Sequence, residues 1–263
     1  APVVLVSNFN DQLYFKMMDF MRYGAVDVVA KPVNPDSWNL ISARLQYILK
    51  NVREFCVDNV SRAKALKTVE GSVTPPEQPA RKLILILGGL GGMLELQKII
   101  PGLEYDAETA VLVLQNMYPG IARYLASYFD EFTHYTTHSL YPGTADLLGG
   151  QCRIGNCYGK KEILLREGDV PAISGAENEE DTVSQDADDL LCSAAQVFGS
   201  ELSLIILSGV DVDLKSGMET VVNRGGRIIL QKPDSCLLPG PIAEIQSLGL
   251  EESSLGPEDI APY

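Results

Sequence analysis

One stretch, Leu83 to Pro101, constrains the fold of this chain more than any other. It opens with the unbroken apolar run Leu83–Leu87, which is typical of a strand buried on both faces of a parallel sheet. Four glycines then predict a tight turn: Gly88, Gly89, Gly91 and Gly92. Apolar residues recur after them at helical spacing. A buried strand, a glycine turn and a helix begin an α/β unit, and ligands of such folds bind where the strands end.

This turn contains no Ser, Cys, Thr, Lys or His, so it offers no side chain that could react. A dinucleotide fingerprint would need a third glycine where Leu94 stands. It would also need an acidic residue after the next strand, which ends in Gln115-Asn116. We therefore expect the turn to serve packing, and a nucleotide site is the alternative.

The composition predicts a globular protein that does not bind nucleic acid. The formal net charge is −14, and 46% of the residues are hydrophobic. Residues from 81 onward hold 12 basic and 27 acidic residues, whereas residues 1–80 sum to +1. This acidity repels nucleic-acid phosphates and anionic membrane surfaces. No apolar run reaches the ~18 residues of a membrane span, so we expect no membrane insertion.

The cysteines and the first residues indicate a cytoplasmic protein. Five cysteines is an odd number, and they are spread thinly, so we expect reduced thiols rather than a disulfide framework. The start of the chain lacks the basic region and cleavage site of a signal peptide. It also lacks Met and begins almost inside an apolar strand, so we expect a fragment or a trimmed chain.

Residues 1–56 predict two strand–helix pairs, from apolar runs that alternate with apolar stripes at helical spacing. The expected elements are Pro2–Ser7, Asp11–Tyr23, Ala25–Ala30 and a helix from Pro35 to about Leu49. Two strands and two helices make a poor independent core. We expect this segment to pack against the rest of the chain or to pair with another chain, because bare strand edges recruit partners.

Residues 57–80 are polar, end in TPPEQPA and predict a helix tail followed by a stiff linker. Residues 81–263 predict an α/β domain with a doubly wound, mostly parallel sheet, because strands and helices alternate. An antiparallel hairpin, Gln151–Ile154 with Glu162–Leu165, is expected at the edge of that sheet.

The first segment resembles the second half of a response-regulator receiver domain. The strings VVLVSN and GAVDVVAKP are spaced as the fourth and fifth strands of that family are. The resemblance places Ser7 at the family's switch hydroxyl and Lys31 at its phosphate-contacting lysine. Val28 replaces the usual switch aromatic, and the half with the phospho-accepting Asp is absent from this sequence. The resemblance therefore does not imply a phosphorylated switch.

Six pieces of the larger region match the motifs of one enzyme family in order. LGGLGGMLEL…IIP stands where that family reads IGASTGGPEAL…LLP, and VLVLQNMYPG where it reads VVVQHMP. DADDLLCSAAQVFG, LSGVDVDL, GGRIILQ and SCLLPGP follow, against SVDVLFESAARAYG, LTGMGxDG, GGRTIAQ and SVVYGMP. Residues 83–262 thus resemble the catalytic domain of the chemotaxis protein-glutamate methylesterases, the CheB family. The resemblance implies a carboxylic ester hydrolase that needs no cofactor and no metal.

The resemblance fails at the catalytic residues. The family's nucleophilic Ser, general-base His and orienting Asp fall at Gly89, Asn116 and Asp213. Ester hydrolysis needs a nucleophile activated by a base, and the Asp only orients that base. Loss of either group in another triad enzyme costs about 10⁶ in turnover. Asp211, where the family has Gly, adds a carboxylate that opposes a developing oxyanion.

An acidic loop over residues 174–189 also argues against activity on chemoreceptors. The resemblance places it near the catalytic face, where it would repel the Glu-rich helices of a chemoreceptor. A plain solvated loop is the alternative, and the regular spacing of a calcium site is missing. Its seven acids are Glu177, Glu179, Glu180, Asp181, Asp186, Asp188 and Asp189.

Two residue pairs have the spacing of metal ligands, but we expect neither to bind a metal. His134 and His138 fall on an expected strand, where their spacing separates them by about 13 Å. Cys152 and Cys157 flank the expected hairpin without a second pair or a suitable His. Surface histidines and reduced thiols are therefore the expectation.

The sequence predicts a degenerate CheB-type domain that is not catalytic and acts as an interaction or regulatory module in two-component signalling. Its partners would be signalling proteins, such as chemoreceptor or histidine-kinase components, and the first segment could mediate homo-oligomers. The alternative is an active methylesterase with a relocated nucleophile, such as Ser208. Ser208 and Ser235 lie on turns near the expected site, but without a His in reach we expect them to be structural.

Overall fold

The computed structural model describes residues 1–8, 14–31, 38–60, 66–69, 77–117, 120–157, 159–175 and 183–261. Some predicted features lie outside these residues: the two helix starts at Asp11 and at Pro35, residues 61–65 and 70–76 of the predicted helix tail and linker, and the acids Glu177, Glu179, Glu180 and Asp181.

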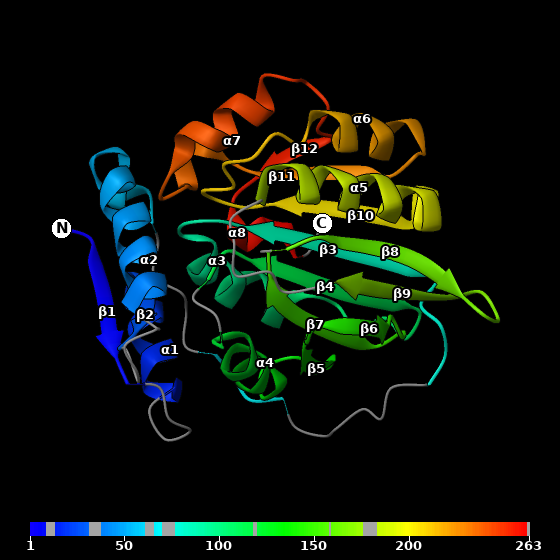
Figure 1. The fold of residues 1–263 in the computed structure, drawn as a ribbon, viewed down its shortest axis with the longest axis horizontal. Coiled ribbons are helices and arrows are strands. Elements are labelled where there is room, and N and C mark those ends of the chain that lie inside the picture. The colour runs from blue at the N-terminus through cyan, green and yellow to red at the C-terminus, as the bar shows by residue number, and fades with distance from the viewer. Residues whose placement is uncertain are drawn as a thin grey trace.

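The centre of the protein is a seven-stranded sheet in the order β12-β11-β10-β3-β4-β7-β5 (Figure 1). Every neighbouring pair in it is parallel. The strands are β3 (Lys82–Gly88), β4 (Thr109–Gln115), β5 (Thr136–Ser139), β7 (Gln151–Asn156), β10 (Leu202–Ile206), β11 (Arg227–Gln231) and β12 (Ser253–Leu255). The predicted α/β class and parallel sheet are confirmed.

Helices cover both faces of this sheet, because the central strands are apolar on both sides. Leu83, Leu85 and Leu87 of β3 pack on the face covered by α5 and α6, and Ile86 lies in the cluster on the opposite face with residues of α3 and α4. The helices are α3 (Gly92–Ile99), α4 (Ala122–Asp130), α5 (Val183–Phe198), α6 (Lys215–Asn223), α7 (Pro239–Gln246) and α8 (Pro257–Ile260).

The antiparallel strands form a separate three-stranded sheet, in the order β6-β9-β8. It consists of β6 (Gly143–Asp146), β8 (Lys161–Arg166) and β9 (Val170–Gly175). The predicted pairing of Gln151–Ile154 with Glu162–Leu165 is wrong. Instead, β7 lies in the main sheet between β4 and β5, and β8 pairs with β9. The reason is burial: β7 carries Cys152 and Ile154 into the core, as an interior parallel strand does.

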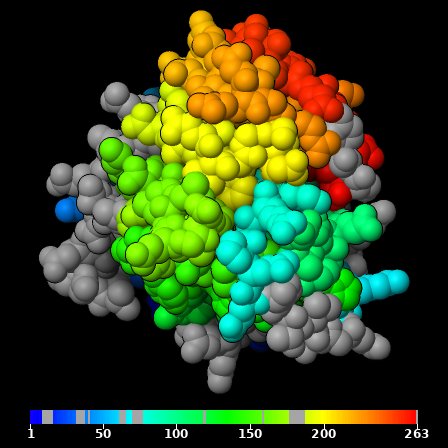
Figure 2. Space-filling view, turned by 90° about the vertical axis from the view of Figure 1, so that its right-hand side faces the viewer, coloured from blue at the N-terminus to red at the C-terminus, as the bar shows by residue number. Residues whose placement is uncertain are grey.

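The N-terminal segment, residues 1–56, forms the predicted strand–helix pairs. β1 (Val3–Ser7) and β2 (Ala25–Ala30) are parallel, and α1 (Tyr14–Arg22) and α2 (Trp38–Asn51) follow them. The segment packs against the larger region, one of the two outcomes expected, because Met17, Met18 and Met21 of α1 enter the cluster that α3 and α4 build. It lies at the carboxyl ends of the main strands, and the opposite side is formed mainly by the larger region (Figures 1 and 2).

A buried ion pair fixes α2 to β2 and to the main sheet. The Arg44 guanidinium lies 2.6 Å from the Asp27 carboxylate, and both side chains are almost fully buried. The same guanidinium donates to the side-chain oxygen of Asn116 and, at 3.0 Å, to its backbone carbonyl. Burial raises the pKa of Asp27, and the charge of Arg44 opposes that rise. The segment is therefore tied to the residue that follows β4.

Replacing Arg44 by Met should lower the free energy of unfolding by about 3–5 kcal/mol, because it leaves the Asp27 carboxyl buried without its cation. Urea denaturation at neutral pH measures the change. Arg53→Met, which removes an exposed charge just beyond the same helix, is the matched control and should change stability by less than about 0.5 kcal/mol. Equal effects of the two variants would contradict this role of Arg44.

Candidate functional site

The turns after β3 and β10 meet backbone to backbone. The Gly89 N–H donates to the Ser208 carbonyl at 3.0 Å. A Cβ placed on Gly89 would overlap the carbonyl group of Gly209, and one on Gly209 would overlap the backbone of Leu90. Gly209 also has a φ of +72°, a conformation that favours glycine. The position predicted to replace the catalytic Ser therefore admits no side chain in this arrangement.

Ser208 is fully engaged in holding these turns. It is completely buried, and its Oγ donates to the Leu90 carbonyl at 2.8 Å while accepting the Leu238 N–H at 3.1 Å. Its own N–H donates to the Gln231 side-chain oxygen at 2.8 Å. Ser235 is tied in the same way, since its Oγ donates to the Lys232 carbonyl at 2.7 Å. Both hydroxyls have the structural role expected of them.

Asn116, at the predicted position of the general base, is held on both sides. Its N–H donates to the Gly88 carbonyl at 2.7 Å, and its side-chain oxygen accepts from Arg44. The side chain of the preceding residue, Gln115, donates to the carbonyls of Gly89 and Asn116 at 2.8 and 3.0 Å. The amide thus occupies a fixed structural position and supplies no proton acceptor for catalysis.

Asp213, at the predicted position of the orienting Asp, lies exposed just before α6. Its Oδ1 accepts the Lys215 N–H at 3.1 Å, so it stabilises the first turn of that helix. Asp211 is exposed on the same loop. The structure therefore gives the predicted Asp position a local role in the loop and in helix α6.

Both histidines of the chain lie away from these turns. His138 is on β5 and His134 is just before it, both exposed, and β4 and β7 separate β5 from β3 in the sheet. Partial burial, with the nearby charge of Arg153, lowers the pKa of His138. With no histidine beside Gly89 or Ser208, neither turn has the usual base for activating a hydroxyl.

The receiver-like residues lie together. Ser7 ends β1, and its carbonyl accepts the N–H of Lys31, the residue after β2, at 2.8 Å. The Lys31 side chain is exposed. Ser7 and Lys31 therefore lie at adjacent ends of two parallel strands.

All five cysteines are free thiols. Cys157 lies at the end of β7, and burial raises its pKa to about 11 although the positive charges of Lys161 and Arg44 oppose that rise. Burial likewise raises the pKa of Cys152 to about 12. Neither thiol is therefore a thiolate at neutral pH, and neither is an activated nucleophile.

Two buried charged pairs were not predicted from the sequence. For Arg44 and Asp27 a signal existed: Arg44 falls on the apolar stripe with Ile41 and Ile48, and Asp27 interrupts an apolar strand. Opposite charges on two buried faces favour a pair between them. The other pair joins Lys98 to Glu95 at 2.7 Å on α3; the spacing of three residues was visible, but their burial was not.

The larger region is matched by the sequence model of the CheB methylesterase, over residues 84–263. The chain belongs to the CheB methylesterase family. A relative from Pyrococcus horikoshii, a protein-glutamate methylesterase/protein-glutamine glutaminase, is 25% identical over 94% of this chain and 68% of its own length. A relative of the same description from Symbiobacterium thermophilum is 27% identical over 99% of this chain and 75% of its own length.

The fold agrees with this membership. The crystal structure of the Thermotoga maritima CheB methylesterase catalytic domain superposes with a TM-score of 0.61, at 23% identity, over 69% of this chain and 95% of that domain. At this identity the likeness establishes the shared fold alone. Among the residues described for this CheB-family chain, no helix is both long and apolar enough to span a bilayer.

Replacing Gly89 by Ala should lower the free energy of unfolding by about 3 kcal/mol, because the two turns must separate to admit a methyl group. Urea denaturation measures this effect. Gly240→Ala is the control, since a Cβ there meets nothing within 4 Å. A Gly89→Ala protein as stable as the control would show that the two turns are not held together.

Glu95 should make stability depend on pH. Burial raises its pKa to about 7 in the folded state, against the ordinary 4.5, although Lys98 opposes the rise. The folded state then binds more protons between these values, so the free energy of unfolding should fall by roughly 3 kcal/mol as pH rises from 4.5 to 7. Glu95→Gln should lack this part of the slope, and Glu244→Gln, on an exposed residue, should retain it.

Urea denaturation of the three proteins at intervals of half a pH unit measures the slopes. Identical slopes for the wild type and the Glu95→Gln protein would mean that Glu95 keeps its ordinary pKa.

Proposed function

We propose that this chain is a CheB-type domain that no longer hydrolyses esters. It acts as a non-catalytic interaction or regulatory module in a chemotaxis-type two-component system of the cytoplasm. The observation that carries the proposal is the backbone contact between Gly89 and Gly209, which fills the place where the family's nucleophile would project.

The chemistry supports the proposed loss of activity for both reactions in the relatives' names, the hydrolysis of a methyl ester and of a glutamine amide. A methyl ester and a primary amide are both attacked at a carbonyl carbon, and both attacks need an activated nucleophile. Gly89 supplies none, and Asn116 is held by Arg44 where a base would have to act. Asp213 alone has no imidazole to orient.

The alternative is an active hydrolase with a relocated nucleophile. The hydrogen bonds of the Ser208 and Ser235 hydroxyls argue against it. Ser208 is buried and uses its proton to bond the Leu90 carbonyl, and Ser235 uses its proton to bond Lys232. A nucleotide-binding module has less support still. A Cβ on Gly91 would lie 2.7 Å from the Leu237 Cβ and 3.0 Å from the Ser208 Oγ, so side chains already cover this turn.

The partners we propose are signalling proteins, such as chemoreceptor or histidine-kinase components, and not nucleic acid. In this proposal residues 1–56 are a receiver-like segment, 57–80 a helix tail and linker, and 81–263 the methylesterase-like domain. Ser7 and Lys31 are then remnants of a receiver switch. The segment could also mediate homo-oligomers, since six of the large apolar side chains exposed among the described residues belong to it: Val3, Val6, Phe20, Tyr23, Trp38 and Leu49.

Methanol release from a methylated chemoreceptor fragment tests the proposal. The chain should release no methanol above the rate without protein, whereas the Thermotoga maritima catalytic domain, as the positive control, should release it. Methanol release at a rate comparable with that control would overturn the proposal.

The double variant Gly89→Ser/Asn116→His should also release no methanol, because a serine Cβ at position 89 collides with the Gly209 carbonyl. Activity restored in this variant would show that the turns open readily. In that case only the missing side chains, and not the closed contact, would account for the loss of hydrolysis.

A further inference from the structure

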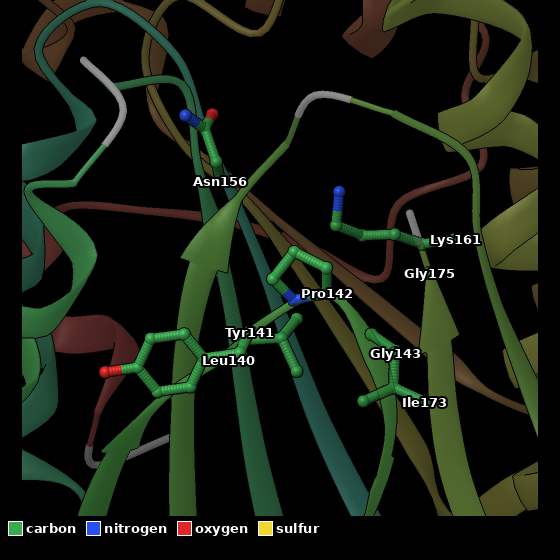
Figure 3. Close-up of a pocket in the computed structure, with 8 residues that line it drawn as sticks. All are labelled: Leu140, Tyr141, Pro142, Gly143, Asn156, Lys161, Ile173 and Gly175. Atoms are coloured by element: carbon green, nitrogen blue, oxygen red, sulfur yellow. The ribbon is translucent and has the colours of Figure 1, made fainter. Parts of the chain in front are cut away.

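The hollow where the two sheets meet is too small for a side chain of a partner. It lies at the carboxyl end of β7, and Leu140, Asn156 and Lys161 are among the residues that line it (Figure 3). Its enclosed part has room for about one water molecule. The hollow is therefore a packing defect between the sheets, whereas the N-terminal segment presents an open surface.

That open surface is the outer edge of β1. Among the strands that the structure describes, β1 pairs with β2 alone. Every residue of β2 is buried, whereas none of β1 is, and Val3 and Val6 are 54% and 46% exposed. Figure 1 shows β1 on the outer side of the segment, with β2 between it and the larger region. One edge of this two-stranded sheet therefore faces solvent.

The backbone groups of Val4 and Val6 point out of this edge. In a parallel ladder a residue directs its N–H and its carbonyl to the same neighbour, and the next residue directs both to the opposite side. The Ser7 carbonyl accepts the Lys31 N–H at 2.8 Å, so Ser7 and, two residues earlier, Leu5 face β2. Val4 and Val6 therefore present their donors and acceptors on the side away from β2.

The sequence of β1 does not protect this edge. Natural edge strands avoid pairing by means of charged side chains, proline or a bulge in the edge strand itself. The strand VVLVS has neither a charge nor a proline. The register shifts at Val3/Val4, but the extra residue is Val26 of β2, so β1 itself is continuous. An exposed, apolar and uncharged edge of this kind favours pairing with another strand.

Charge favours a second copy of this chain as the occupant. Each copy has a net charge of −14, and residues 1–80 contribute +1 to it, so the acidic excess lies in the larger region. Two copies repel one another over their larger regions, and this repulsion is weakest where their N-terminal segments meet. Val3 and Val6 are also among the large apolar side chains exposed in the described residues, and an interface between copies would cover them.

We propose that two copies of this chain pair antiparallel along β1, about a twofold axis that passes through Leu5. Val4 of one copy then lies opposite Val6 of the other. Because both residues direct their backbone groups outward, they exchange both hydrogen bonds. A parallel ladder between the copies would place Val4 opposite Leu5 and could not be symmetric. The twofold contact is closed, so it produces a dimer rather than a filament.

This dimer rests on the proposed function, in which the N-terminal segment mediates homo-oligomers, and it gives that contact a strand, a direction and a register. The β1–β2 pairs of the two copies become one continuous sheet, with β1 and its symmetry mate at the centre. Each copy keeps its larger region on the far side of β2. The acidic regions of the two copies therefore stay apart.

Sedimentation equilibrium of the full chain over a wide range of concentrations tests the proposal, and we expect a reversible monomer–dimer equilibrium. Val6→Lys, which puts a charge on the open edge strand, should weaken dimerisation at least tenfold. Val222→Lys on α6 is the matched control, because that valine is 41% exposed, and it should leave dimerisation unchanged. Circular dichroism and urea denaturation establish that both variants are folded.

Cross-linking through an added cysteine tests the register. Opposite residues that do not bond one another have Cα atoms about 4.5 Å apart, within the range of a disulfide. Leu5→Cys should therefore form a disulfide between copies when oxidised with copper–phenanthroline in air. Val3→Cys should not, because Val3 lies opposite Ser7 of the second copy. Peptide mapping under non-reducing conditions identifies the link, with the wild type and its five free thiols as the blank.

A chain that stays monomeric at every concentration would overturn the proposal and would assign the edge of β1 to a different polypeptide. Dimerisation of the Val6→Lys protein as strong as that of the wild type would overturn it as well, as would equal cross-linking of Leu5→Cys and Val3→Cys. The dimer involves neither Gly89 nor Asn116, so these outcomes are independent of methanol release. Failure of the dimer leaves the proposed loss of hydrolysis standing.

Discussion

The contact between the Gly89 and Gly209 turns is the constraint on which the rest of this structure depends. Two glycines let the backbones after β3 and β10 touch. The Ser208 hydroxyl holds them together through hydrogen bonds with the Leu90 carbonyl and the Leu238 N–H. The carboxyl ends of these strands form the edge where α/β enzymes place their catalytic side chains. Here the protein's own backbone occupies that edge at Gly89 and Gly209, while the fold of the CheB family is retained.

The N-terminal segment completes this closed arrangement. Arg44 carries its charge from α2 into the core, where Asp27 neutralises it and Asn116 accepts its hydrogen bonds. The Cys56 N–H also donates to the Leu237 carbonyl at 2.8 Å, so the segment holds the loop that bonds Ser208. Segment and sheet therefore stabilise one another.

Much of the fold could be predicted from the sequence, since β3, β4 and β10 are unbroken or nearly unbroken apolar runs bounded by polar residues or turns. The pairing of β7 could not, because a short strand carries the same pattern whether it joins a hairpin or an interior position, and only the burial of Cys152 and Ile154 decides. At the site, the sequence predicted that Gly89 and Asn116 stand at the family's Ser and His positions. It could not indicate the contact at Gly209 or the hydrogen bonds of Asn116, because these join residues far apart in the chain.

The most direct test of the closed site is labelling with a serine-directed fluorophosphonate, followed by intact-mass spectrometry of the native chain. The account predicts an unmodified mass, because Ser208 is buried and no side chain projects from Gly89. The Thermotoga maritima catalytic domain, treated in parallel, establishes that the reagent is active. One stoichiometric adduct on the native chain would reveal an activated hydroxyl and would contradict the account.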